Sequence, residues 1–130
     1  MTLDERLTDA FDLGLSEGVQ SLSPEDQQLY RIQDFILEFE MGGLSGYMYN
    51  RLPDVAGIGE TVAALRQFEF LRLSELLEQT ANLFREYRDP NPPTTWEQVR
   101  KEYDPENRLD SIADEISALA KRGYGVSSVA

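Results

Sequence analysis

The aspartates and glutamates are the residues of this chain that could take part in catalysis. The sequence contains 24 aspartates and glutamates, and pairs one helical turn apart, such as Asp34 with Glu38 and Asp110 with Asp114, place two carboxylates on one helix face. Such a pair can perform general acid-base catalysis when its surroundings separate the two pKa values. On amphipathic helices the same spacing more often gives two solvated charges, which is the interpretation we favour.

The chain lacks the other residues on which enzymes usually depend. It has no histidine and no cysteine, which excludes the most frequent general base, thiol nucleophiles, disulfides and thiolate metal sites. The segment from Asp104 to Asp110 alternates oxygen side chains like a calcium loop, but Arg108 stands at a ligand position and the glycine of the sharp turn is missing. We therefore predict no enzymatic activity, no metal and no cofactor.

The charge of the chain narrows the possible partners. The 24 acidic residues face only 12 basic ones, so the net charge is −12. Nucleic acids and anionic membranes repel such a protein, and we expect it to bind neither directly. Residues 1–40 carry a net charge of −8, residues 41–88 carry −1 and residues 89–130 carry −3. The negative field is therefore concentrated at the N-terminal end.

Acidic residues near the N-terminus have helical spacing. Thr2 and Glu5 form a capping box ahead of an apolar stripe, which predicts a helix over about residues 3–16. Glu5, Asp9 and Asp12 follow one another at steps of four and three, so they project from one face about 5 to 6 Å apart. This face is either a solvated surface that aids solubility or a binding surface.

A longer helix is expected to carry further acids. Ser23 is a good N-cap and Pro24 a favourable first residue, and an apolar stripe continues from there to Phe39. Asp34 and Glu38 fall on the polar face of this helix. We predict that they join the acids of the first helix in one continuous negative surface. The candidate partner-binding residues are Glu5, Asp9, Asp12, Asp34 and Glu38.

Two adjacent glycines, Gly42 and Gly43, interrupt the long helix. Glycine adopts a positive φ without steric cost, so the pair predicts a bend between two helices, although the pattern does not say which glycine has the positive φ. An aromatic-rich segment with Tyr47 follows, before Asn50. We expect its aromatic side chains in the core; the alternative is an exposed tyrosine or two that contacts a partner.

These residues resemble a known family, the bacterial DNA-mimic proteins, an all-helical domain formerly of unknown function. The corresponding family segment typically reads Asn-Gly-Gly-Phe-x-Gln-Tyr-Phe-x-Asn, and this sequence keeps Gly42, Gly43, Tyr47 and Asn50. The resemblance extends over residues 24–120. It implies a homodimer that imitates the phosphate backbone of DNA and occupies the DNA-binding face of a basic protein, such as a transcription regulator.

Residues 57–87 could form one helix or two. The apolar stripe shifts its phase around Phe68, Phe70 and Leu71, and we therefore predict two helices with a break at this point. The same shift makes it hard to bury all three side chains in one core. Apolar surface left exposed there would favour self-association, which agrees with the homodimer that the resemblance implies.

The C-terminal part contains further helix signals. Three prolines in residues 88–93 predict a loop. Behind it, Thr94 with Glu97 predicts a helix start through a capping box, and Asp104 with Pro105 predicts another through an N-cap followed by proline. These signals bring the expected number of helices to about six or seven.

No stretch alternates at period two between hairpin turns. We predict an all-α fold, with residues 1–130 in a single compact domain without a sheet and with a polar tail at residues 123–130. No apolar run approaches the roughly 18 residues that span a bilayer, and the N-terminus is acidic where a signal peptide is basic. We expect a cytoplasmic protein.

Two functions from different classes remain open at this stage. The first is a non-enzymatic acidic binding protein of the DNA-mimic kind, because carboxylates along a helix approximate the spacing of successive phosphates. The second is a helical immunity or regulatory module that binds a cognate protein without imitating DNA. The sequence does not identify the partner of either.

Overall fold

The computed structural model describes residues 1–88 and 95–125, and the regular structure within these residues is entirely helical. The all-α class is therefore confirmed. The predicted loop at residues 88–93 and the predicted tail at residues 123–130 lie largely outside the described residues. In chain order the elements are α1 (Leu3–Glu17), the 3-10 helix η1 (Val19–Ser21), α2 (Pro24–Arg51), η2 (Leu52–Gly57), α3 (Ile58–Gln67), α4 (Leu71–Leu83), α5 (Trp96–Tyr103), α6 (Arg108–Ala120) and η3 (Gly123–Gly125).

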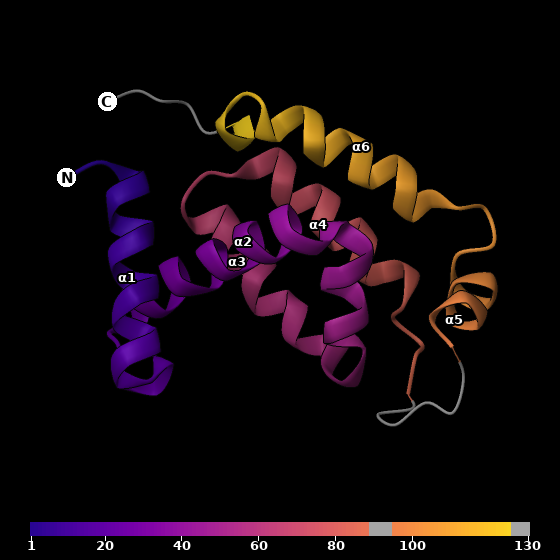
Figure 1. Cartoon of the computed structure of the whole chain (residues 1–130), viewed down its shortest axis with the longest axis horizontal. Helices are drawn as coiled ribbons and strands as arrows, with labels where there is room; N and C mark the ends of the chain where they lie inside the picture. The colour runs from indigo at the N-terminus through magenta and orange to yellow at the C-terminus, as the bar shows by residue number, and fades with distance from the viewer. Residues whose placement is uncertain (89–94, 126–130) are drawn as a thin grey trace.

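The helices surround one core (Figure 1). α2, α3 and α4 form its centre, with α3 packed against both of the others, and α6 lies along α2 and α4. α1 packs mainly on α2, at one end of the molecule, and α5 lies at the opposite end (Figure 1). α1 is thus held at its end of the molecule chiefly by its extensive packing on one neighbour, α2.

The first two helices begin where the capping patterns predict. The Thr2 side-chain oxygen accepts the Glu5 N–H at 3.1 Å, and the Ser23 oxygen accepts the Asp26 N–H at 3.1 Å. Pro24 is the first residue of α2, where its missing N–H removes no intrahelical hydrogen bond. Both helices therefore start with a satisfied N-terminus.

A bend at Gly43 divides α2 into residues 24–42 and 44–51. Gly43 has φ 70° and ψ −177°, a region of backbone conformation that is open essentially to glycine alone. Gly42 is not among the described glycines with positive φ. The predicted bend is confirmed, and Gly43 is the glycine that forms it.

The core is built mostly from the apolar stripes of α2, α3 and α4. Each large side chain that is fully buried there stabilises the fold by about 1.5 to 3 kcal/mol. The largest fully buried side chains are Tyr47, Phe35, Phe84, Leu29, Ile32, Leu44, Met48, Ile58, Leu65, Leu73, Leu76 and Leu77. Tyr47 contacts Phe35 edge to face at 4.8 Å between ring centroids, so the second half of α2 folds back onto the first.

α3 and α4 are two separate helices, as the phase shift predicts. α3 ends in a Schellman motif: the Phe70 N–H bonds to the Leu65 carbonyl at 2.8 Å and the Glu69 N–H to the Arg66 carbonyl at 3.1 Å. Glu69 takes the positive φ, 66°, that glycine usually supplies. Phe70 is buried and Leu71 is exposed.

The predicted N-cap of α5 is wrong by one residue. Thr95 is the N-cap, and its side chain accepts the Gln98 N–H at 3.3 Å while Gln98 Oε1 accepts the Thr95 N–H at 3.1 Å. Thr94, the predicted cap, lies outside the described residues. Thr94 with Glu97 and Thr95 with Gln98 both satisfy the capping-box pattern, so the pattern alone could not choose between them.

The predicted start of α6 is also wrong. The helix begins at Arg108 after Asn107, which has φ 60°. Asp104, the predicted N-cap, is buried and lies further upstream, where its two carboxylate oxygens accept the N–H groups of Arg108 at 2.7 Å and Leu109 at 2.9 Å. Asp104 therefore satisfies the first amides of α6 from outside the helix.

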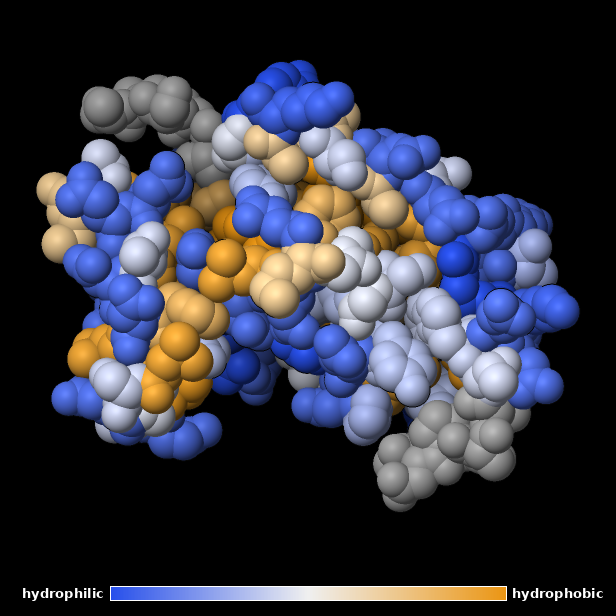
Figure 2. All heavy atoms as spheres, viewed as in Figure 1, coloured by the Kyte–Doolittle hydropathy of each residue, from blue (hydrophilic) through white to orange (hydrophobic). Residues whose placement is uncertain are grey.

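On the face shown in Figure 2, hydrophilic residues cover the outer side of α5 and α6, whereas the α1 end shows both hydrophilic and apolar residues. The exposed apolar residues of α1 include Leu13 and Leu15. Within the part of the chain that the structure describes, no helix combines the length and the apolar character needed to cross a lipid bilayer.

Candidate acidic interaction surface

α1 carries the largest group of uncompensated acids. All five of its acidic side chains are exposed, and none forms a salt bridge within residues 1–88 and 95–125. These side chains, which we call the α1 acids, are Asp4, Glu5, Asp9, Asp12 and Glu17. Arg6, the one basic residue of α1, pairs with Glu25 of α2 and lies 5.6 Å from the Phe68 ring centroid. The positive charge of α1 therefore faces the body of the protein.

Aromatic packing fixes α1 on α2. Phe11 stacks on Tyr30 at 4.9 Å between ring centroids, while Leu7, Ala10 and Gly14 are buried. A Cβ atom at Gly14 would overlap the Tyr30 ring, so the missing side chain permits this close approach. The contact turns the opposite side of α1, with its acids, toward solvent.

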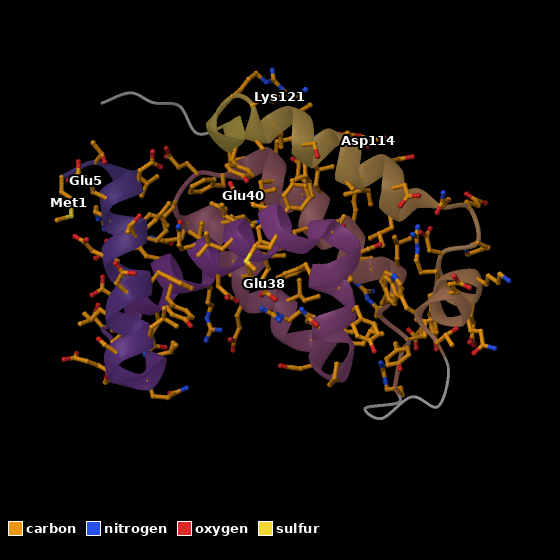
Figure 3. The ribbon with its side chains drawn as sticks, in the orientation of Figure 1. Met1, Glu5, Glu38, Glu40, Asp114 and Lys121 are labelled. Carbon is orange, nitrogen blue, oxygen red and sulfur yellow. The ribbon has the colours of Figure 1, made fainter. Side chains whose placement is uncertain are left out.

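Three of the α1 acids belong to the predicted binding set. Glu5, Asp9 and Asp12 are exposed and share one helical face at the spacing of about 5 to 6 Å that steps of four and three residues give. Glu5 lies on the outer side of α1, far from Glu38 near the centre of the molecule (Figure 3). Their role in binding a partner stays a prediction.

Asp34 and Glu38 lie in a different environment. Arg51 pairs with Asp34 at 2.8 Å and also pairs with Glu38, and Glu38 lies inside the angle between the two halves of α2 (Figure 3). The exposed fractions of these side chains are 32% for Asp34, 24% for Glu38 and 28% for Arg51. We call these three residues the bend cluster, because they connect the two halves of α2.

The bend cluster shifts the titration of Asp34. Burial is the largest cause, followed by the negative charge of Glu38, and together they raise the pKa of Asp34 to about 6 although Arg51 acts in the opposite direction. The cluster holds two carboxylates and one guanidinium, so it is left with one uncompensated negative charge when both are ionised. Asp34 and Glu38 thus contribute less to an external negative field than two free acids would.

Arg51 is the residue that sequence reasoning missed. It lies 17 residues after Asp34 and 13 after Glu38, a separation that helical periodicity does not connect. The pair becomes visible only once the chain reverses at Gly43. The double glycine was the available signal, because a sharp bend brings the residues on either side of it together.

The family-motif residues converge on the same bend. Gly43 forms it, Gly42 ends the preceding half of the helix, and Tyr47 is 1% exposed beneath Arg51, whose guanidinium carbon lies 4.8 Å from its ring centroid. The Asn50 amide donates to Glu38 at 3.4 Å. These contacts give the motif a structural role at the bend. Tyr47 belongs to the core, as expected, whereas Tyr49 of the same segment is exposed.

A groove lies between η2, α3 and the C-terminal part of α4. Its volume is about 650 Å³, and its walls include apolar residues such as Val62 and Ala81. Arg66, Arg85 and Arg88 also line it. Arg66 pairs with Glu78 at 2.9 Å, whereas Arg85 bonds to the neutral Asn82 side chain at 2.7 Å. The groove is thus less acidic than the rest of the chain.

Comparison with known proteins identifies the family but no individual relative. The model of the DMP19-like protein family matches residues 20–124. No curated protein and no solved structure matches the chain. The matched region contains the bend and its motif residues, whereas α1 precedes it. Because the match covers most of the sequence, the chain belongs to the DMP19-like family of DNA-mimic proteins, the family that its Gly42-Gly43 segment resembles.

Proposed function

We propose that this chain is a non-enzymatic, cytoplasmic binding protein that presents the α1 acids to the DNA-binding face of a basic protein, such as a transcription regulator. Membership of a DNA-mimic family supports this function. The observation that carries it is the exposure of the α1 acids without a salt bridge among the described residues, together with the inward pairing of Arg6.

The spacing of the α1 acids suits this role. Glu5, Asp9 and Asp12 extend along about two turns of one helix, since an α-helix rises 1.5 Å per residue. A DNA strand presents one charge per about 3.4 Å of its axis, so three carboxylates in a row cover a stretch comparable to a few successive phosphates. In this proposal Asp34 and Glu38 add one net negative charge to the field behind α1.

The position of α1 outside the matched residues adds a further element. The match to the family begins at residue 20, and α1 supplies five acids against one arginine before it. We propose that α1 enlarges the negative surface of the domain, in a way that depends on its docking against Tyr30. Loss of the α1 acids should therefore weaken partner binding without unfolding the domain.

A pull-down from a cytoplasmic lysate, with elution by a salt gradient, tests the proposed function. A DNA mimic should retain DNA-binding proteins and release them steeply as salt rises, because screening weakens contacts between exposed charges. Added duplex DNA should compete for the same proteins. If the retained proteins bind DNA and the chain at the same time, occupation of the DNA-binding face is ruled out.

Matched variants separate α1 from the total charge. The α1 variant Glu5→Gln, Asp9→Asn and Asp12→Asn removes three exposed acids, and Glu97→Gln, Glu102→Gln and Glu106→Gln removes three exposed acids from the α5 side. The first should lower the affinity for the retained protein by about tenfold or more, and the second by much less, since only charges at the interface act strongly on association. Equal losses would indicate a general charge effect.

The groove favours the second candidate function. A hollow of about 650 Å³ with apolar walls and three arginines suits a protein segment that is recognised without DNA mimicry. A helical regulatory or immunity module would bind its cognate protein there. In that case, Arg85→Gln should weaken binding and the α1 variant should not.

Self-association is also part of the proposal. Leu71, one of the three out-of-phase residues, is exposed, whereas Phe70 is buried and Phe68 is half-buried. The exposed apolar surface around the phase shift is therefore smaller than the sequence pattern predicts. Light scattering at low and moderate salt decides between the dimer and a monomer of 14.8 kDa.

A further inference from the structure

The bend of α2 depends on two features that lie side by side. Gly43 supplies a backbone conformation open essentially to glycine, and the bend cluster joins the two halves that this glycine separates. Arg51, at the end of the second half, bonds to Asp34 and Glu38 of the first. Breaking these contacts would leave the Asn50–Glu38 hydrogen bond and side-chain packing to hold the angle.

The bend cluster is not balanced in charge. It holds two carboxylates within reach of one guanidinium, and the Asp34 and Glu38 side chains also form a hydrogen bond with each other when one of them carries a proton. With that proton the cluster is neutral and the carboxyl groups attract each other. Without it they repel, and Arg51 is the cation that opposes the repulsion.

We propose that Asp34, Glu38 and Arg51 form a proton-sensitive connection across the Gly43 bend, which is firm when Asp34 is protonated and loosens when Asp34 is ionised. The inference concerns the regulation of the fold and does not depend on the identity of a partner. Its consequence is that mildly acidic conditions hold the second half of α2 more firmly against the first.

The direction of the effect follows from the surroundings of Asp34. Burial is the largest cause that raises the pKa of Asp34, and the charge of Glu38 raises it further. Arg51 lowers the pKa by less than these two causes raise it, so the pKa of Asp34 is about 6. A carboxyl whose pKa is higher in the folded state than in the unfolded state, where it is about 3.9, binds protons more tightly when folded. The free energy of unfolding therefore falls as the pH rises from about 3.9 to about 6, and above about 6 the destabilisation by ionised Asp34 is fully present.

Other charged and titratable groups face this region. Tyr30, one turn before Asp34, has its pKa raised by burial and then by Asp34 and Glu38, and it stacks on Phe11 of α1. Tyr47 lies beneath Arg51. Further groups on the packed elements are Glu60 of α3, which pairs with Arg31 at 2.8 Å, and Asp54 of η2, which accepts the Gly57 N–H at 3.2 Å.

These neighbours titrate outside the pH range in question or are already paired. The raised pKa of Tyr30 and of Tyr47 keeps both phenols protonated around neutral pH. Glu60 carries its own counterion, Arg31. The charge change near the bend between pH 5 and 7.5 is therefore assigned to the bend cluster.

Amide hydrogen exchange of residues 44–51, measured by NMR from pH 5 to 7.5 and corrected for intrinsic exchange, tests the proposal. The wild-type opening constant should rise about tenfold over this range, because part of a pKa difference of about two units is released on local opening. Asp34→Asn should abolish the rise to within about twofold. An equal rise in the variant, or none in the wild type, overturns the proposal.

Asp114→Asn is the matched control. Asp114 is exposed on α6, away from the bend, and this substitution removes the same charge (Figure 3). It should leave the tenfold rise intact; loss of the rise in this variant would show that total charge, and not the bend cluster, is responsible. If Asp34→Asn fails to fold, the carbon-13 resonance of the wild-type Asp34 carboxyl decides: a midpoint near 6 supports the proposal and one near 4 overturns it.

Discussion

α1 and the first half of α2 are both acidic amphipathic helices, but their acids do different things. The α1 acids are exposed and carry no salt bridge within the described residues, while Arg6 turns inward to Glu25. In α2, Asp34 and Glu38 share Arg51 across the Gly43 bend. Equal charge in the sequence therefore gives an external field in one helix and an internal connection in the other.

The difference arises from the path of the chain. α1 is followed by a simple return through Gly18 and η1, and its outer face, with Glu5, Asp9 and Asp12, stays exposed. α2 reverses at Gly43, and the reversal brings a cation onto its polar face. A negative residue thus becomes available to a partner only where the fold brings no cation to it.

Removing the cation of the bend cluster should have the largest effect on stability. Arg51→Gln leaves two half-buried carboxylates without their counterion, and we expect the free energy of unfolding to fall by about 2 to 3 kcal/mol at pH 7.5. Arg6→Gln, which breaks the more exposed pair with Glu25, should cost less than about 1 kcal/mol. Urea unfolding of both variants measures the contrast, and equal losses would contradict it.

The bend itself can be tested with two neighbouring glycines. Gly43→Ala forces a side chain into a conformation reserved for glycine and should cost about 1 to 2 kcal/mol. Gly42→Ala has open space and no positive φ, so it should stabilise the helix by about 0.5 kcal/mol or more. Thermal melting measures the two opposite changes in stability. A Gly43→Ala variant as stable as the wild type would show that the bend does not require glycine at position 43.

The docking of α1 depends on a missing side chain. Gly14→Ala places a methyl group against the Tyr30 ring and should cost about 1 kcal/mol through overpacking. Gly46→Ala has open space around its Cβ atom and should not destabilise. Exchange of α1 amides should increase in the first variant alone; an unchanged α1 would show that its position does not depend on this contact.

Much of the fold could be predicted, because it depends on local signals. Ser23 with Pro24 marks the start of α2, and the phase shift near Phe70 marks the break between α3 and α4. These features arise from residues a few positions apart, where hydrogen bonding and periodicity decide the structure. The predicted N-caps of α5 and α6 were wrong. Two adjacent threonines fit the capping-box pattern of α5, and Asp104 bonds to the first amides of α6 from outside the helix.

The site was less predictable than the fold. Periodicity correctly places Glu5, Asp9 and Asp12 on exposed positions of one helix, because a helical face follows from spacing alone. It could not separate them from Asp34 and Glu38, whose counterion arrives through a reversal of the chain. Salt bridges between distant positions depend on tertiary structure, so net charge per segment overstates the available negative surface.

The smallest expected change in stability belongs to the α1 variant. Glu5→Gln, Asp9→Asn and Asp12→Asn remove exposed acids that form no salt bridge within the described residues, so the free energy of unfolding should change by no more than about 0.5 kcal/mol. Glu5→Gln keeps an oxygen that can accept the Thr2 hydroxyl, as the Glu5 carboxylate does at 3.2 Å. A large loss of stability, seen in urea unfolding, would show that these acids support the fold.

The affinity of a protein retained in the pull-down, measured by titration calorimetry at several salt concentrations, tests the central claim most directly. Wild-type affinity should fall steeply with salt, while the α1 variant should bind about tenfold or more weakly at low salt and depend less on salt. The α5-side control should resemble the wild type. An α1 variant with wild-type affinity and salt dependence would contradict the claim that α1 presents the negative surface of this protein.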